Sequence, residues 1–132
     1  ATDKLAKAFT MGSHGSTFGG HPVSCAAALA EVTELLDKDL AGNAKKMGTY
    51  FLEQARKEIP HLKEARGQGL MIGLEFDGVN SVDIKHKCLE KHMLTTAIGS
   101  NIIRLVPPLI LQKEHVDKAI AILKEAVEEL TK

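Results

Sequence analysis

The chain has 132 residues, and its 17 basic and 17 acidic residues give it a formal net charge of zero. A neutral chain is not typical of nucleic-acid-binding proteins, which carry a basic excess that displaces counterions from phosphates. With 44% hydrophobic residues and no net charge, the composition also excludes an intrinsically disordered chain.

The N-terminal part of the chain combines a short helical pattern, a glycine-rich loop and a longer helix. Residues 5–9 have helical spacing, whereas residues 12–22 hold four glycines among Ser, Thr and His and cannot pack a core. The backbone of such a loop is able to approach a ligand closely, because glycine lacks a side chain. Pro22 then suits the first position of a helix. One apolar helical stripe follows, at Cys25, Leu29, Val32 and Leu36.

The rest of the chain changes between helical and strand patterns. A helical stripe runs over residues 40–55 and ends before Pro60, and a last stripe runs over residues 116–130. Between them, residues 63–69 predict a short strand that leads to a glycine kink. The remaining predicted elements are strands at residues 70–76 and 102–106, a short extended piece at residues 94–98 and a helix at residues 82–91. This order predicts an α+β fold in which helices cover one face of a small sheet.

The glycine-rich loop is the first candidate for a binding site. Free amides at the start of a helix, with Ser and Thr hydroxyls nearby, favour an anion such as phosphate. The pattern is neither the P-loop nor the dinucleotide-binding fingerprint, because no strand, loop and lysine context surrounds it. From its residues, the segment is either a phosphate-binding loop or a structural entry into the helix.

Arg104 is the second candidate, because it lies in the middle of a predicted strand between Ile103 and Leu105. A guanidinium in a partly buried site needs an anionic partner, and a carboxylate that accepts two hydrogen bonds is the natural one. That partner is either a bound ligand or an internal Glu or Asp. Arg66 raises the same question, but its neighbouring glycine favours a structural role.

The other chemically reactive residues give weaker signals. The six histidines show no metal-ligand spacing, so we expect no metal site. Cys25 and Cys88 lie far apart, as is typical of free thiols in a cytosolic protein, and Cys25 is expected in the core because it lies on an apolar stripe. No segment approaches the roughly 18 apolar residues of a membrane span, and the start lacks a signal-peptide pattern. We therefore expect a cytoplasmic protein that does not enter membranes.

Three blocks of the sequence stand in the same order as in one enzyme family. They are HGSTFGGHP at residues 14–22 followed by CAAAL at 25–29, RGQGLMIG at 66–73, and IRLVPPL at 103–109. In these blocks the chain resembles the class III pyridoxal-phosphate-dependent aminotransferases. Within the family it is most similar to the acetylornithine aminotransferases, and the ornithine and 4-aminobutyrate aminotransferases are similar here too. The resemblance covers nearly the whole chain.

The resemblance implies a pyridoxal 5'-phosphate cofactor and roles for three residues. Thr17 matches the threonine that binds the cofactor phosphate, reaching across the dimer interface into the partner's site. Ser16 matches the position that borders the acyl-ornithine substrate, and Arg104 matches the arginine that pairs with a substrate carboxylate. Hydroxyl and amide donors fit a phosphate, and a planar guanidinium fits a carboxylate.

The resemblance also implies that the chain is the C-terminal portion of a longer enzyme. The family's Schiff-base lysine is expected upstream, so no catalytic residue is assigned, and Lys4 and Lys7 are taken as ordinary helix lysines. Residues 22–132 would be the small domain of a fold-type I enzyme, with helices on one face of a mainly antiparallel sheet. Residues 1–21 would be a cofactor and interface segment of the large domain. Without the lysine, the fragment is expected to be inactive.

For the whole enzyme, the resemblance implies a cytoplasmic homodimer in arginine biosynthesis. It would transfer the terminal amino group of N-acetylornithine to 2-oxoglutarate, which becomes glutamate, and would bind neither nucleic acid nor membranes. Two alternatives stay open. One is a related aminotransferase that acts on ornithine or 4-aminobutyrate, and the other is a stand-alone α+β regulatory module whose Arg104 binds a carboxylate ligand.

Overall fold

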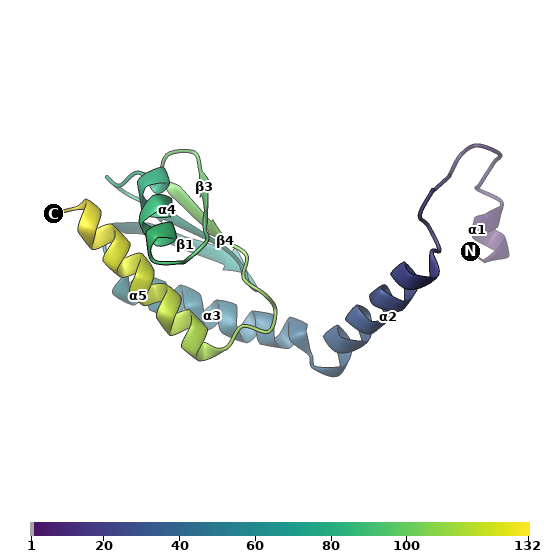
Figure 1. Cartoon of the computed structure of the whole chain (residues 1–132), viewed down its shortest axis with the longest axis horizontal. Helices are drawn as coiled ribbons and strands as arrows, with labels where there is room; N and C mark the ends of the chain where they lie inside the picture. Colours follow the sequence, from purple (N-terminus) through teal and green to yellow (C-terminus); the bar gives the residue numbers. More distant parts are fainter. Residues whose placement is uncertain (1) are drawn as a thin grey trace. The chain divides into compact units, whose positions relative to one another are not determined.

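The computed structural model describes residues 2–132, which form two compact units with a boundary after Asp37 (Figure 1). The first unit holds the short helix α1 (Asp3–Ala6) and the long helix α2 (Pro22–Asp37). The second unit holds, in chain order, α3 (Leu40–Glu58), β1 (Leu62–Gln68), β2 (Met71–Phe76), α4 (Ser81–Glu90), β3 (Thr96–Ile98), β4 (Ile102–Leu105) and α5 (Lys113–Leu130). The domain boundary predicted between residues 21 and 22 stays a prediction.

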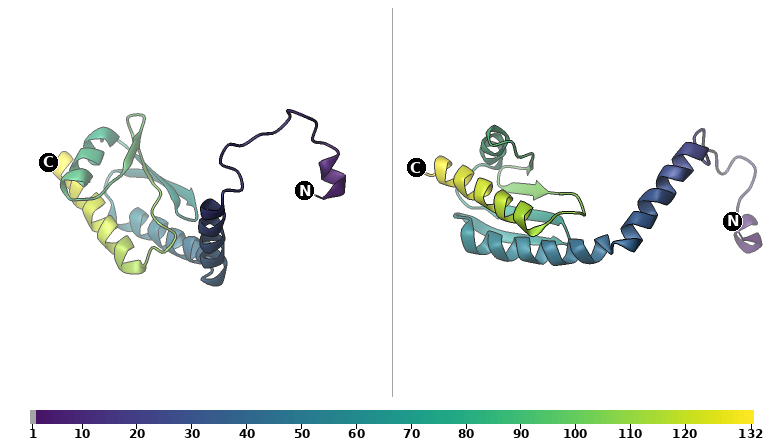
Figure 2. Two further views of the ribbon diagram at one scale, coloured as in Figure 1. Left: turned by 45° about the vertical axis from the view of Figure 1, so that its right-hand side comes forward. Right: turned by 60° about the horizontal axis from the view of Figure 1, so that its bottom comes forward.

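The strands of the second unit form one antiparallel sheet in the order β1-β2-β4-β3. One face of the sheet packs on the helices, and its side chains Ile72, Leu74 and Ile103 are at most 1% exposed. Helices α3 and α5 lie side by side along this face (Figure 2). The predicted α+β fold, with helices on one face of a small antiparallel sheet, is confirmed.

Helix α3 forms where its apolar stripe predicts it. Asp39 precedes it in a left-handed backbone conformation, with φ at 45°, and its carboxylate accepts a hydrogen bond from the Gly42 amide at 3.2 Å. This cap satisfies one of the amides that a helix start leaves without a partner. The buried residues of α3 are Ala44, Met47, Gly48, Phe51 and Ala55. The helix ends before Pro60, as predicted.

Helix α2 also forms at the predicted position, but its apolar stripe is not buried within the first unit. Cys25 is exposed, and Leu29 and Leu36 are 70% and 69% exposed. The prediction that Cys25 is a core residue is therefore wrong for this unit, because helical periodicity identifies an apolar face without saying what covers it. The first helix differs as well, since it covers Asp3–Ala6 rather than residues 5–9.

Lys91, at the end of α4, ties that helix to α5. Its Nζ lies 2.8 Å from Oε1 of Glu129 and 2.9 Å from Oε1 of Glu125. The hydrogen bond to Glu129, which contributes most, and the hydrogen bond to Glu125 raise the pKa of Lys91 to about 12. Lys91 in turn lowers the pKa of Glu129. Lys91 therefore stabilises the fold below its ordinary pKa and loses this effect as the pH rises through about 12. Glu129 contributes above its ordinary pKa and loses its effect as the pH falls through the lowered one.

We predict that Lys91→Met lowers the urea midpoint of the chain at neutral pH. The effect is small because the ion pairs are exposed, and it disappears in about 1 M salt, which screens them. It also decreases as the pH falls through the lowered pKa of Glu129, because the protonated carboxyl no longer pairs with Lys91. Circular dichroism during urea unfolding measures the midpoint, with the exposed Lys118→Met of α5 as the control. An equal decrease in the control would contradict the role of Lys91.

Candidate functional site

The glycine-rich loop lies in the first unit and leads into α2. Ser16 and Thr17 are exposed, and neither hydroxyl makes a hydrogen bond within the part of the chain that the structure describes. Gly19 packs against Ser16, because a Cβ on Gly19 would lie 2.7 Å from the Ser16 Oγ. Gly20 has a φ of +76°, which side chains rarely tolerate. These two glycines therefore form a tight turn that leaves both hydroxyls available to a ligand.

The first amides of α2 are donors without a partner inside the helix. Pro22 opens the helix and carries no amide hydrogen, and the Cys25 amide donates to the His21 carbonyl at 2.9 Å. The amides of Val23 and Ser24 therefore lie before the first bond of the helical ladder. Hydroxyl and amide donors of this kind match the chemistry of a phosphate group, so the residues present fit the phosphate of the implied cofactor.

Arg104 lies in β4 on the face of the sheet away from the buried core. We call this the open face; its residues are Glu64, Arg66, Gln68, Met71, Gly73, Glu75, Thr96, Ile98, Ile102 and Arg104. Arg104 is opposite Gly73 of β2 and Thr96 of β3. Its exposed side chain makes no hydrogen bond or ion pair with any described residue. The internal carboxylate that the sequence left open as its partner is therefore not found among residues 2–132.

Glu75, the acidic residue of β2 on the open face, is already paired with other cations. Its Oε1 accepts a hydrogen bond from Lys63 at 2.7 Å, and its Oε2 accepts one from Arg66 at 2.9 Å. These two bonds, with Lys63 the larger contributor, lower the pKa of Glu75. Arg66 also donates to Glu64 at 2.7 Å, so its predicted structural role is consistent with this cluster. The four charges compensate one another, so Arg104 has no counter-ion among residues 2–132.

One amide side chain of α3 hydrogen-bonds to the segment that follows β4. Asn43 donates from Nδ2 to the carbonyl oxygen of Leu109 at 2.7 Å and to that of Leu111 at 3.0 Å. The two prolines after the strand, at positions 107 and 108, cannot donate backbone hydrogen bonds of their own. Asn43 therefore anchors the segment next to the strand that carries Arg104.

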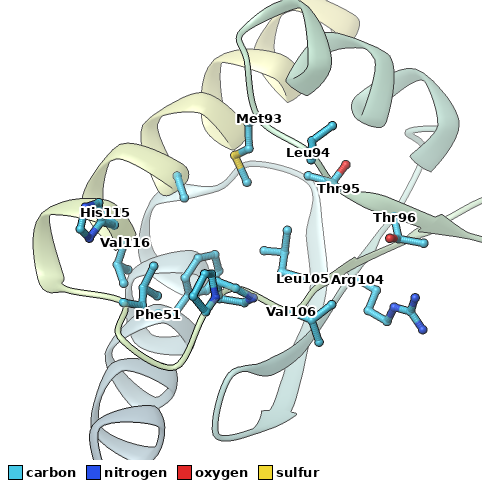
Figure 3. Close-up of a pocket in the computed structure, with 14 residues that line it drawn as sticks. Phe51, Met93, Leu94, Thr95, Thr96, Arg104, Leu105, Val106, His115 and Val116 are labelled. Carbon is cyan, nitrogen blue, oxygen red and sulfur yellow. The ribbon is translucent and has the colours of Figure 1, made fainter. Parts of the chain in front are cut away.

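A cavity of about 460 Å³ lies beside β4, between α3, α5 and the segment before β3 (Figure 3). Its wall is mainly apolar and includes Phe51 and Val116. The Oγ1 of Thr95 is buried there without a hydrogen-bond partner among the described residues. Arg104 lies at the edge of the cavity, below Thr96 in this view, and its guanidinium points away from the interior (Figure 3). The guanidinium of Arg104 therefore lies on the open face rather than in the cavity.

The other candidate residues do not form a second reactive centre in the described structure. Among residues 2–132, no group of three His, Cys, Asp or Glu side chains is arranged to hold a metal ion. No described helix has both the length and the apolar character for crossing a membrane. Burial raises the pKa of the Cys88 thiol to about 11, so it is uncharged at neutral pH. His115 accepts a hydrogen bond at Nδ1 from the Gln112 amide at 3.2 Å, at the start of α5.

The predicted phosphate-contact and carboxylate-contact residues lie in different units. Ser16 and Thr17 belong to the first unit and Arg104 to the second. The sequence did not single out Gly73 or Asn43. The alternation in β2 is the signal that places Gly73 on the same face as its neighbours at positions 71 and 75, but only the strand order brings it opposite Arg104.

A family profile described as aminotransferase class-III matches residues 1–127. The chain belongs to the class-III aminotransferases. Acetylornithine aminotransferases from Methanothermobacter thermautotrophicus and Methanocaldococcus jannaschii are 40% and 44% identical to this class-III chain over 98% of its length. The matches cover 34% and 33% of those two proteins, so the chain spans about a third of the curated relatives it matches.

Solved aminotransferases have the same fold as this class-III chain. An ornithine aminotransferase from Toxoplasma gondii, described with PLP at partial occupancy in its active site, aligns with a TM-score of 0.84 at 30% identity. The alignment covers 97% of this chain and 32% of that one. The predicted family and fold class are therefore confirmed, while the roles of Ser16, Thr17 and Arg104 stay predictions.

Proposed function

We propose that the chain is the C-terminal part of an acetylornithine aminotransferase that uses pyridoxal phosphate. The observation that carries this proposal is the match of the class-III profile to residues 1–127, together with the similarity to two acetylornithine aminotransferases. The whole enzyme transfers the terminal amino group of N-acetylornithine to 2-oxoglutarate, as a cytoplasmic homodimer. Similarity to ornithine aminotransferases of Staphylococcus aureus, at 40% identity, makes ornithine the second candidate donor.

Thr17 and Ser16 supply the chain's contribution to the cofactor site. The Thr17 hydroxyl donates to the cofactor phosphate, and Ser16 borders the acyl group of the substrate. The support for these roles is that both hydroxyls are exposed and unpaired among the described residues, beside a helix start. When bound, pyridoxal phosphate supplies an electron sink that the twenty amino acids lack.

Arg104 holds a carboxylate of the substrate. The support is its position on the open face, its lack of a partner among residues 2–132, and the pairing of Glu75 with Lys63 and Arg66. A guanidinium with two parallel donors fixes both the position and the orientation of a carboxylate. Arg104 thereby orients the substrate for chemistry that other residues of the whole enzyme perform. We expect the isolated chain to be inactive, because the Schiff-base lysine is assigned to the preceding part of the enzyme.

A chimera tests the proposal. In it, this chain replaces the matching third of the Methanothermobacter enzyme, and the purified protein is assayed for cofactor content, dimerisation and initial rates with three donors. We expect a cofactor-loaded dimer that uses N-acetylornithine faster than ornithine or 4-aminobutyrate. A loaded dimer that prefers ornithine would replace the proposed substrate with the second candidate, and a loaded dimer without amino transfer would contradict the proposal.

We predict that Thr17→Ala in the chimera weakens cofactor retention by roughly tenfold, because one hydrogen bond to a charged group is lost. The cofactor is titrated into the apo-protein, and its binding is followed by absorbance. Thr10→Ala is the matched control, since Thr10 lies in the same unit, where its backbone bonds to Ser13. Equal retention in the Thr17→Ala variant and the unmodified chimera would refute the phosphate contact.

A further inference from the structure

Gly73 is an unusual residue for the middle of β2. It lies on the open face, opposite Arg66 of β1 on one side and Arg104 of β4 on the other. Glycine weakens the interior of a strand, because it packs no side chain and loses more backbone freedom on folding than other residues. An interior strand glycine therefore often marks a place where a ligand or another backbone approaches closely.

The fold of the second unit does not require glycine at this position. Gly73 is absent from the residues with a positive φ, and a Cβ added to it would meet only Arg66 atoms at 3.9 Å, an ordinary contact distance. Two other glycines of regular elements differ. A Cβ on Gly67 would overlap the carbonyl oxygen of Met71, and one on Gly48 would overlap that of Gly69. Packing explains those two glycines but not Gly73.

The space beside Gly73 leads to the unpaired guanidinium. A Cβ at position 73 would meet Arg66 at 3.9 Å and no atom of Arg104 within 4 Å. Because directly opposite Cβ atoms of an antiparallel pair are about 4.5–5.5 Å apart, a side chain larger than alanine would reach the stem of Arg104. Glu75, two residues along the same strand, does not compete for Arg104, because both its oxygens accept hydrogen bonds from Lys63 and Arg66. No carboxylate of the described residues is therefore bonded to Arg104, and the surface next to it is open.

We propose that Gly73 keeps the guanidinium of Arg104 open to the substrate carboxylate. This inference rests on the proposed function, in which Arg104 binds that carboxylate. A larger side chain at position 73 covers the guanidinium from the β2 side and excludes a carboxylate that must reach both of its donors. Gly73 itself does not touch the ligand; its contribution is the space that it leaves.

Arginine modification of the whole 132-residue chain tests this proposal. Phenylglyoxal reacts with accessible guanidinium groups, and peptide mass spectrometry gives separate rates for Arg56, Arg66 and Arg104. We expect Gly73→Leu to slow the modification of Arg104 several-fold, with the rate at Arg56 unchanged. Gly73→Ala should slow it less and raise the urea midpoint, and Gly73→Thr provides a β-branched variant suited to a strand. Gln68→Leu is the control, because it adds an apolar side chain to the open face away from Arg104.

The carboxylate is tested separately, by adding 2-oxoglutarate as a protecting ligand. Slower modification of Arg104 in the presence of 2-oxoglutarate supports the proposed function. Loss of this protection in Gly73→Leu supports the role of Gly73. If 2-oxoglutarate gives no protection while Gly73→Leu still slows modification, the carboxylate role of Arg104 in this chain fails and the access role of Gly73 stands. If folded Gly73→Leu and Gly73→Thr both react at Arg104 as fast as the unmodified chain, the Gly73 proposal is overturned.

Discussion

Replacing Arg104 by methionine in the chimera is expected to raise the KM for 2-oxoglutarate by roughly 10- to 100-fold. The charge-assisted hydrogen bonds of a guanidinium to a carboxylate contribute about 1.5–3 kcal/mol, and each 1.4 kcal/mol is about a factor of ten in affinity. The neighbouring cations cannot replace Arg104, because among the described residues Lys63 and Arg66 are already bonded to Glu75. The KM of Arg104→Lys should lie between those of the unmodified chimera and of Arg104→Met, since an ammonium keeps the charge without the planar pair of donors.

The control for Arg104 is another arginine of the same unit. Arg56 donates to the carbonyl oxygen of Ala65, so its replacement by methionine removes a contact inside the fold. We expect Arg56→Met to lower the unfolding midpoint and to leave the KM for 2-oxoglutarate nearly unchanged. If Arg104→Met also left that KM unchanged in a folded, cofactor-loaded chimera, its assignment as the carboxylate contact would be wrong.

Gly48→Ala should destabilise the second unit by about 1–3 kcal/mol, the usual cost of forcing extra atoms into a packed site. A glycine-to-alanine change inside an ordinary helix stabilises it by about 1 kcal/mol. Here the sign is reversed, because a Cβ on Gly48 would overlap the backbone carbonyl of Gly69 in the β1–β2 turn. The Cβ would also lie 2.6 Å from the carbonyl carbon of Gly69, so the overlap involves backbone atoms, which cannot rotate away as the end of a flexible side chain can.

The experiment on Gly48 compares two adjacent positions of α3 in the 132-residue chain. Urea unfolding, followed by circular dichroism, gives the free energy of unfolding of each variant. Thr49→Ala is the control, because Thr49 is exposed and its hydroxyl donates to the Lys45 carbonyl of the same helix, at 3.0 Å. Its change should stay within about 0.5 kcal/mol. A Gly48→Ala variant that is more stable than the unmodified chain would show that the helix and the turn do not meet as described.

The sequence predicted the elements of the second unit well, because each element has its own apolar periodicity. Phe51 and Leu123 each belong to a helical stripe, and both are at most 2% exposed in the structure. The stripe of α2 is equally regular, yet Leu29 is 70% exposed. Periodicity depends only on local spacing, so it could not distinguish a helix that is covered within its unit from one that is not.

The surroundings of Arg104 could be predicted only in part. The sequence showed that this arginine interrupts an apolar strand and that it needs an anion. It could not choose between an internal and an external anion, because that depends on which strands become neighbours. The order β1-β2-β4-β3 places Gly73 opposite Arg104 and lets Glu75 bond to Lys63 and Arg66. The Glu75 pairs form between the consecutive strands β1 and β2, whereas Gly73 and Arg104 lie on strands that are not consecutive, and no local pattern specifies that pairing.

The most direct measurement is the formation of glutamate from N-acetylornithine and 2-oxoglutarate by three preparations. They are the chimera, the isolated 132-residue chain, and the Methanothermobacter enzyme from which the matching third has been deleted. We predict that the chimera forms glutamate and that the other two preparations do not, because the substrate-contact and lysine-bearing parts must be joined. Glutamate formation by the isolated chain, or none by a folded and cofactor-loaded chimera, would contradict the assignment of this chain to such an enzyme.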